Sequence, residues 1–166
     1  MKKMLRLLFA AISASFLLYC TGQKPDTARE EAAIRAVIEG EINASFDGDY
    51  TKWMTFFVHE PYVVYLQADK NNYLDLKGWD TISVAARNWI RPSRKGTILF
   101  GGNTGYSFRI MNDMAWVSFK SSSTLTSDCG ESQMTGLEVR TLEKHEGLWK
   151  IVYLGSVFSS TYPGAK

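Results

Sequence analysis

The C-terminal part of the chain most constrains its fold, because it reads as four long strands in succession. Apolar and β-branched residues predict strands over 97–110, 114–126, 134–144 and 148–159. Turn-forming stretches at 111–113 and 144–147 separate the first strand from the second and the third from the fourth. Tight turns between long strands predict antiparallel hairpins. The sequence therefore predicts an antiparallel sheet for this region.

The last of these strands is apolar on both faces. Trp149, Ile151 and Tyr153 would share one face, with Val152 and Leu154 on the other. A strand of this kind is expected to be covered on both sides. Helices can cover one face, and the other needs either more of the same chain or a second subunit. We therefore expect a homodimer formed through the sheet.

The region before the sheet predicts three helices and one strand. Thr27 as N-cap and Glu30 three residues later form a capping box, and apolar residues recur at helical spacing from Ile34 to Phe46. Gly48 stops this helix, and Asp49 is the expected N-cap of a short helix over 50–57. A strand over 62–66, a turn at 71–73 and a third helix over 79–90 follow.

The first 22 residues have the three parts of an export signal. Lys2, Lys3 and Arg6 form a charged start, and residues 7–19 form an uncharged, largely apolar core. That core is shorter than the about 20 apolar residues that a membrane-spanning helix needs. We therefore expect an exported, cell-envelope protein with a signal and tether over 1–22 and one domain over 23–166.

Cys20 stands where the apolar core gives way to a polar stretch, and this junction resembles the lipobox of bacterial lipoproteins. Leu17 fits the residue favoured three positions before the cysteine, whereas Leu18 and Tyr19 are larger than the family pattern. The resemblance implies cleavage before Cys20 and its lipidation, so that the protein is anchored in a membrane and faces the periplasm or the cell surface. Ordinary cleavage near 13–15 and an uncleaved anchor are the alternatives.

The net charge gives no sign of a nucleic-acid partner. The leader holds three of the 19 Lys and Arg residues and none of the 17 Asp and Glu, which leaves 16 against 17 in the mature chain. A near-neutral domain lacks the basic surface that nucleic acid binding needs.

No metal site or cofactor is expected from the sequence. His59 and His145 are far apart and neither belongs to a ligand-spaced cluster. If Cys20 carries lipid, Cys129 is left as a free thiol in a polar loop. A Cys20–Cys129 disulfide is the competing interpretation.

Several loose motifs in the right order resemble the nuclear transport factor 2-like (NTF2-like) superfamily, and within it the bacterial SnoaL-like branch. They are the Asp-Gly-Asp break at 47–49, the stretch over 56–64, Gly-Trp-Asp-Thr-Ile at 78–82 and Glu-Lys-His-Glu-Gly-Leu-Trp-Lys-Ile-Val at 143–152. The resemblance implies an α+β fold in which a strongly curved antiparallel sheet wraps about three N-terminal helices as a cone. Such a cone has a mostly apolar pocket at one end.

The family includes isomerases, dehydratases, cyclases and proteins that only bind or assemble, so it leaves catalysis open. Glu41 lies on the core-facing stripe of the long helix, where a carboxylate must pair with an arginine such as Arg140, reach solvent or have a raised pKa. His59 precedes the first strand. It could serve either as an acid or base near the pocket or as an ordinary capping and hydrogen-bonding group. In the ketosteroid isomerase branch, the base and the oxyanion donor occupy the positions of Tyr65 and Glu41, so that machinery is absent here.

Other candidates are charged and aromatic residues. Glu138 and Arg140 share one strand face, either as a structural pair on a solvated face or as groups that hold a polar ligand. The tryptophans Trp53, Trp79 and Trp116 are expected in the core, although an apolar pocket also needs such walls.

These observations predict a cell-envelope lipoprotein that binds a small, largely apolar molecule in its cone. The alternatives are a lyase or isomerase that acts on a small carbonyl compound, with Glu41, His59 and Tyr65 sharing the acid, base and donor roles, and a non-catalytic assembly or scaffold module.

Overall fold

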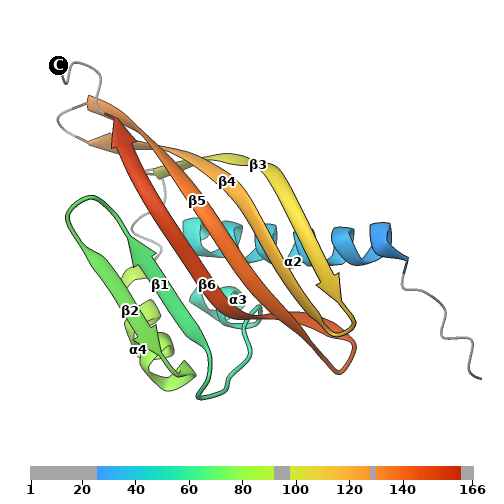
Figure 1. Cartoon of the computed structure of the whole chain (residues 1–166). Helices are drawn as coiled ribbons and strands as arrows, with labels where there is room; N and C mark the ends of the chain where they lie inside the picture. Colours follow the sequence, from blue (N-terminus) through green and yellow to red (C-terminus); the bar gives the residue numbers. More distant parts are fainter. Residues whose placement is uncertain (1–25, 92–97, 128–129, 162–166) are drawn as a thin grey trace, which may run out of the picture.

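A six-stranded mixed sheet curves around one long helix in this computed structural model, which describes residues 26–91, 98–127 and 130–161 (Figure 1). The strand order is β2-β1-β6-β5-β4-β3. The elements in chain order are α2 (Thr27–Asp47), α3 (Tyr50–Met54), β1 (Val64–Ala68), β2 (Tyr73–Lys77), α4 (Trp79–Trp89), β3 (Ile98–Met111), β4 (Met114–Ser127), β5 (Gly130–His145) and β6 (Leu148–Thr161). The predicted α+β class, with a strongly curved sheet around N-terminal helices, is confirmed.

Helix α2 supplies the apolar face on which the sheet closes. Asp26, one residue before the predicted Thr27, is the N-cap, and its side chain accepts a hydrogen bond from the Arg29 amide. Gly48 ends the helix in the left-handed conformation at φ 71°, as the sequence predicted. Between these ends Ile34 and Ile38 are fully buried.

The first turn of α2 is also fixed to the far hairpin of the sheet. One Glu30 carboxylate oxygen lies 2.7 Å from Lys144 Nζ, and the other accepts a hydrogen bond of 2.7 Å from Trp149 Nε1. Glu30 therefore joins the helix start to β5 and β6, which are more than a hundred residues away in the chain. No helix among the described residues is long and apolar enough to cross a membrane.

Strand β2 was missed by the sequence prediction, which placed only a turn at 71–73. The Asp69 side chain accepts hydrogen bonds from the amides of Asn71 and Asn72, and this turn returns the chain antiparallel to β1. Strand β1 itself starts at Val64 rather than residue 62, and it pairs with β6 in parallel. The prediction of a wholly antiparallel sheet was therefore wrong at this one pairing.

The four long strands and the two turns between them are confirmed. Asn112 and Glu146 have positive φ values of 51° and 53°, as tight hairpins require. Strand β5 begins at Gly130, four residues before the predicted start, because its first residues continue to pair with β4. Cys20 and Cys129 lie outside the described residues.

A bulge explains why β6 looked apolar on both faces. Thr141 pairs with Tyr153 but Leu142 pairs with Ile151, so Val152 is an extra residue in β6. Because a bulge shifts the alternation of side chains by one, Ile151 and Leu154 are both buried although they lie three residues apart.

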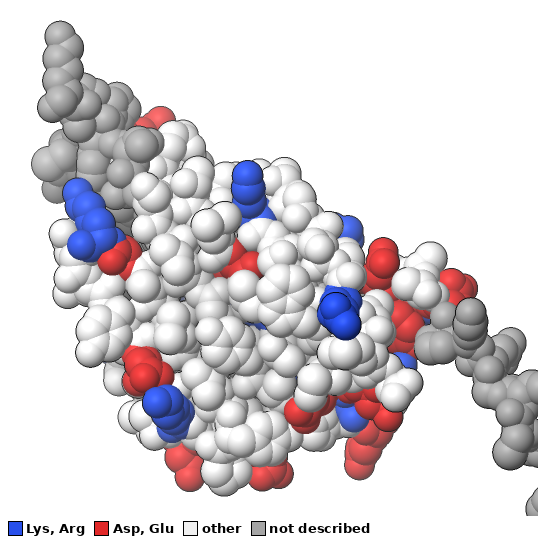
Figure 2. Space-filling model, viewed as in Figure 1, with Lys and Arg blue, Asp and Glu red and all other residues white. Residues whose placement is uncertain are grey.

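The outer face of the sheet is largely uncharged at its centre, and charged side chains lie toward its periphery (Figure 2). Trp116, expected in the core, lies on this face and is 41% exposed. Leu137 and Val157 pair across β5 and β6 and are 61% and 54% exposed. They alternate with Glu138 and Ser156, whose side chains point to the concave side.

Candidate functional site

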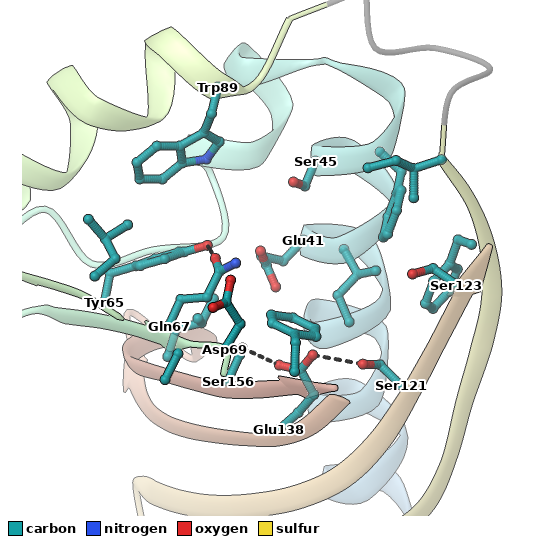
Figure 3. A pocket seen from close by; sticks show the side chains of 18 of the residues that line it. Glu41, Ser45, Tyr65, Gln67, Asp69, Trp89, Ser121, Ser123, Glu138 and Ser156 are labelled. Carbon is teal, nitrogen blue, oxygen red and sulfur yellow. Dashed lines mark hydrogen bonds between the residues drawn. The ribbon is translucent and has the colours of Figure 1, made fainter. Parts of the chain in front are cut away.

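A cavity of about 510 Å³ opens at the end of the cone where α2 finishes (Figure 3). The last turns of α2 form one wall, β1 and β2 a second, and the concave face of β3 to β6 the third. Half of the described lining residues are apolar or aromatic, and the other half are polar or charged. The lining residues include Ile42, Phe46, Tyr65, Leu74, Trp89, Phe100, Leu154 and Phe158.

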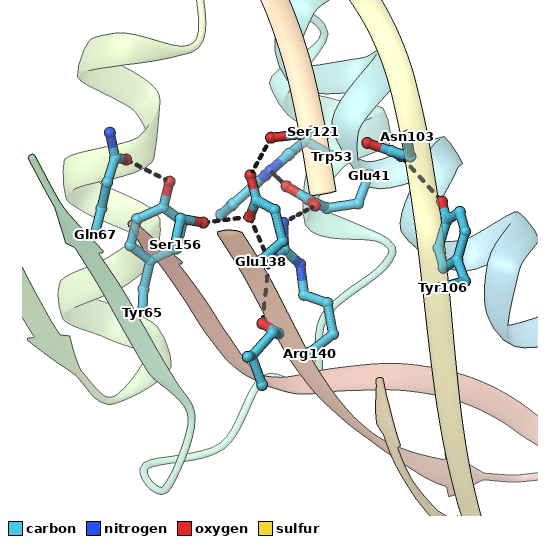
Figure 4. Close-up of polar contacts among 11 residues, drawn as sticks. Glu41, Trp53, Tyr65, Gln67, Asn103, Tyr106, Ser121, Glu138, Arg140 and Ser156 are labelled. Atoms are coloured by element: carbon cyan, nitrogen blue, oxygen red, sulfur yellow. Dashed lines mark hydrogen bonds and ion pairs between the residues drawn. The ribbon is translucent and has the colours of Figure 1, made fainter. Parts of the chain in front are cut away.

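Three buried charged side chains form the floor of the cavity (Figure 4). The two terminal nitrogens of Arg140 contact two different carboxylates: one lies 3.2 Å from Glu41 Oε2 and the other 3.0 Å from Glu138 Oε2. Glu41 comes from α2, whereas Glu138 and Arg140 share one face of β5. None of the three residues is more than 4% exposed. We call these residues the Glu-Arg-Glu triad.

Neutral side chains hold both carboxylates of the triad in place. Trp53 Nε1 donates a hydrogen bond of 2.8 Å to the second oxygen of Glu41. Ser121 donates to Glu138 Oε1 at 2.8 Å, and Ser156 donates to Glu138 Oε2. Arg140 also donates to the carbonyl of Val139. Buried charges need such partners to be tolerated.

One donor of the triad is unused. Arg140 Nε is buried and has no hydrogen-bond partner among the residues that the structure describes.

Burial changes the protonation of the groups around the cavity. It raises the pKa of Glu41, against the opposing effects of the Arg140 charge and the Trp53 hydrogen bond. Burial also raises the pKa of Tyr65, so that its phenol stays protonated. For Arg140, burial acts to lower the pKa, but the charges of Glu41 and Glu138 outweigh it and raise it.

Four of the seven sequence-predicted site residues line the cavity: Glu41, Tyr65, Glu138 and Arg140. The expectation that Glu41 pairs with an arginine such as Arg140 is confirmed. The pairing of Glu138 with Arg140 is confirmed too, but the pair is buried, so the expected solvated face was wrong. These residues meet because Glu41 faces the concave side of β5.

The other three predicted residues do not line the cavity. Trp53 is buried behind the floor, where it acts on Glu41 through its hydrogen bond. The exposed His59 ring stacks on Trp79 at 4.0 Å between centroids, and its Nε2 lies 2.9 Å from the Met54 carbonyl. His59 therefore has the stacking and capping role that was its alternative interpretation.

The sequence analysis missed the polar residues that complete the floor. Ser121 and Ser156 face Glu138 from the two neighbouring strands, and Gln67 accepts a hydrogen bond from the Tyr65 phenol at 3.2 Å. Gly136 is part of the same arrangement, since a Cβ atom there would collide with Ser121. These residues could have been found only from the pairing register of β4 and β5, which places Ser121 beside Gly136 and Glu138.

The site offers groups for hydrogen bonding and proton transfer. In the described ranges, no three His, Cys, Asp or Glu side chains lie close enough together to hold a metal ion. The available groups are a carboxyl with a raised pKa, a second carboxylate, a guanidinium and a protonated phenol, around an apolar space.

We expect Arg140→Met to lower the free energy of unfolding by about 3–5 kcal/mol at pH 7.5, since it leaves two buried carboxylates without their cation. Without the Arg140 charge the pKa of Glu41 rises further above its unfolded value, so the loss should shrink as the pH falls toward 5.5. Urea unfolding at several pH values measures both effects.

Arg109→Met, at an exposed arginine of β3, is the matched control and should change stability little. The triple variant Glu41→Met, Glu138→Leu, Arg140→Met should recover most of the loss, because it removes all three charges together. An Arg140→Met protein as stable as the parent at every pH would contradict this account of the triad.

Comparisons with known proteins support the fold only. No protein-family model matches the chain, and no curated protein sequence matches it significantly. Among solved structures, a candidate scytalone dehydratase from Novosphingobium aromaticivorans aligns with a TM-score of 0.63 and 16% identity, over 84% of this chain and 91% of that one.

Two other solved structures show the breadth of the fold. An NTF2-like protein of unknown function from Shewanella oneidensis aligns with a TM-score of 0.56 and 19% identity, over 77% of this chain and 98% of that one. The association domain of C. elegans CaMKII aligns with a TM-score of 0.62 and 15% identity, over 81% of this chain and 98% of that one. The chain therefore has the NTF2-like cone fold.

Proposed function

We propose that this chain is a cell-envelope lipoprotein whose SnoaL-like domain binds a small, largely apolar molecule in the cone cavity. The observation that carries the proposal is an open cavity of about 510 Å³ with apolar walls and a charged floor. Ligand sites of proteins have this size and this combination of apolar lining with a few convergent polar groups.

The floor indicates how such a molecule would be oriented. Glu41 and Glu138 offer acceptors at the floor, and the aromatic side chains offer flat faces against which an apolar body can pack. A ligand would therefore place its polar end at the triad and its apolar body between Trp89, Tyr65 and Phe100.

A lyase or isomerase is the second candidate, and the raised pKa of Glu41 favours it. A carboxyl whose pKa is raised by burial can act as a general acid, and Glu138 lies on the other side of Arg140, where it can act as a base. His59 has no part in this version, since it lies outside the cavity. A candidate dehydratase shares the fold, but at 16% identity this similarity is no evidence for the same reaction.

An assembly module is less well supported, although an association domain shares the fold. A scaffold has no need of an open cavity, and a buried triad of charges is a poor way to stabilise one.

The outer face of the sheet supports a homodimer as part of the proposal. In a two-fold interface each patch meets its own copy, so a charged centre would repel itself. Leu137 and Val157 form an exposed apolar pair that a second copy can cover, with Trp116 further along β4 and the exposed Lys120 beside Leu137.

The lipid anchor rests on the leader and on the place of Cys20. This cysteine precedes Asp26, the N-cap of α2, by six residues, so the anchor would enter the fold at the start of α2.

Ala68→Trp should abolish ligand binding because it fills the cavity from β1. We expect the affinity for 2-naphthylmethanol, a neutral two-ring probe, to fall at least about tenfold in isothermal titration calorimetry. Ala33→Trp, on the exposed side of α2, is the matched control and should bind as the parent does. Equal affinity in the parent and Ala68→Trp would place binding outside the cavity.

Cys20→Ser should prevent lipidation and release the protein from the membrane fraction of an expressing bacterium. Fractionation followed by mass spectrometry of the N-terminus measures this, with Cys129→Ser as the control that stays in the membrane. A parent protein without acyl chains on Cys20 would refute the lipoprotein part.

Leu137→Lys should convert a dimer to a monomer, because it buries two like charges at the centre of the interface. Light scattering after gel filtration of residues 23–166 reports the mass. Val84→Lys, at an equally exposed valine of α4, should remain dimeric. A parent that runs as a monomer would contradict the dimer.

A further inference from the structure

The cavity carries an excess of negative charge. Among the residues that the structure describes, its lining contains three acidic residues, Glu41, Asp69 and Glu138, and a single basic one, Arg140. We propose that the cavity selects a ligand with a positively charged amine on an aromatic-sized apolar body, and that it rejects carboxylates. This inference rests on the proposed binding function and specifies its ligand class.

Arg140 is not available as a site for an anion. Its two terminal nitrogens contact Glu41 and Glu138 at 3.2 and 3.0 Å, so the guanidinium charge is already matched from two sides. An incoming carboxylate that reached Arg140 would also approach both of these carboxylates. Among the described residues, no lysine and no other arginine lines the cavity to compensate for this repulsion.

The described lining keeps a net negative charge even when Glu41 is protonated. If burial keeps Glu41 neutral, Asp69 and Glu138 still outnumber Arg140. Glu138 uses its oxygens for Ser121, Ser156 and Arg140, and Glu41 uses one oxygen for Trp53 and the other for Arg140. A carboxylate has about four acceptor positions, so both retain capacity for an ammonium donor.

Asp69 places a second negative charge at the mouth. It is exposed, and the hydrogen bonds from the Asn71 and Asn72 amides lower its pKa, so it is ionised at neutral pH. A cation therefore meets negative charge both on entry and at the floor, which attracts it along the axis of the cavity.

The walls suit the same kind of ligand. Tyr65 and Trp89 lie with ring centroids 5.4 Å apart, and Phe46 and Phe100 with centroids 5.2 Å apart, and all four line the cavity. Aromatic faces attract cations and pack against flat apolar bodies. The charges and the rings thus favour one ligand class.

Three probes of nearly equal size test the proposal: 2-naphthylmethylamine, 2-naphthylmethanol and 2-naphthoate. Titration calorimetry on residues 23–166, which contain every element of the fold, is done at pH 7.5 and low salt. We expect the amine to bind at least about tenfold more tightly than the acid, with the alcohol between them. Asp69→Asn should weaken the amine about threefold and leave the alcohol unchanged.

Asp75→Asn is the matched control, since Asp75 lies on β2 outside the cavity and pairs with Lys77 at 3.3 Å. It should leave all three affinities unchanged. If the acid or the alcohol binds as tightly as the amine, the ligand class is wrong and the binding function stands. If none of the three probes binds, both the ligand class and the proposed binding function are wrong.

Discussion

The contact of Arg140 with two carboxylates is the interaction on which the rest of the site depends. It joins the middle of α2 to the centre of β5 across 99 residues of sequence, at a depth where no partner is more than 4% exposed. Burying three charges is expensive, and apolar residues of similar size often give equal or greater stability. The triad is thus better explained by what it offers to the cavity than by the stability that it adds.

The pairing register of the sheet decides which groups reach the triad. Glu138 pairs with Ser156 on one side and lies near Ser121 on the other, and both serines donate to it. The bulge at Val152 is what allows this, since it keeps Ile151 in the core while Leu154 and Ser156 face the cavity. A β6 strand without the bulge would turn one of these two sets to the outer face.

Local patterns in the sequence were enough to predict the long helix and the four long strands. The α2 stripe, the Gly48 stop and the hairpin turns are each determined within a few residues, and Glu41 stood out because a charge interrupted an apolar stripe. The parallel pairing of β1 with β6, the short strand β2 and the burial of Arg140 depend on contacts between distant segments. Charged residues that alternate along a strand, such as Glu138 and Arg140, are typical of a solvent-exposed face. This face is buried because α2 packs against it. For His59 the sequence left two roles open, and the stacking on Trp79, twenty residues away, and the contact with the Met54 carbonyl decide for the ordinary one.

In the proposed lipoprotein, the two ends of α2 would separate the lipid tether from the ligand. The helix has 21 residues and so spans about 30 Å, with Glu30 fixing its start to the β5–β6 hairpin and Ser45 and Phe46 lining the cavity at its other end. A lipid on Cys20 would reach the fold at Asp26, through at most about 20 Å of extended chain. Figure 1 shows the β1–β2 turn beyond the opposite end of the helix, and Asp69 of this turn lines the cavity. An anchor of this kind leaves the mouth unobstructed, and an amine would therefore enter from the aqueous side rather than from the bilayer.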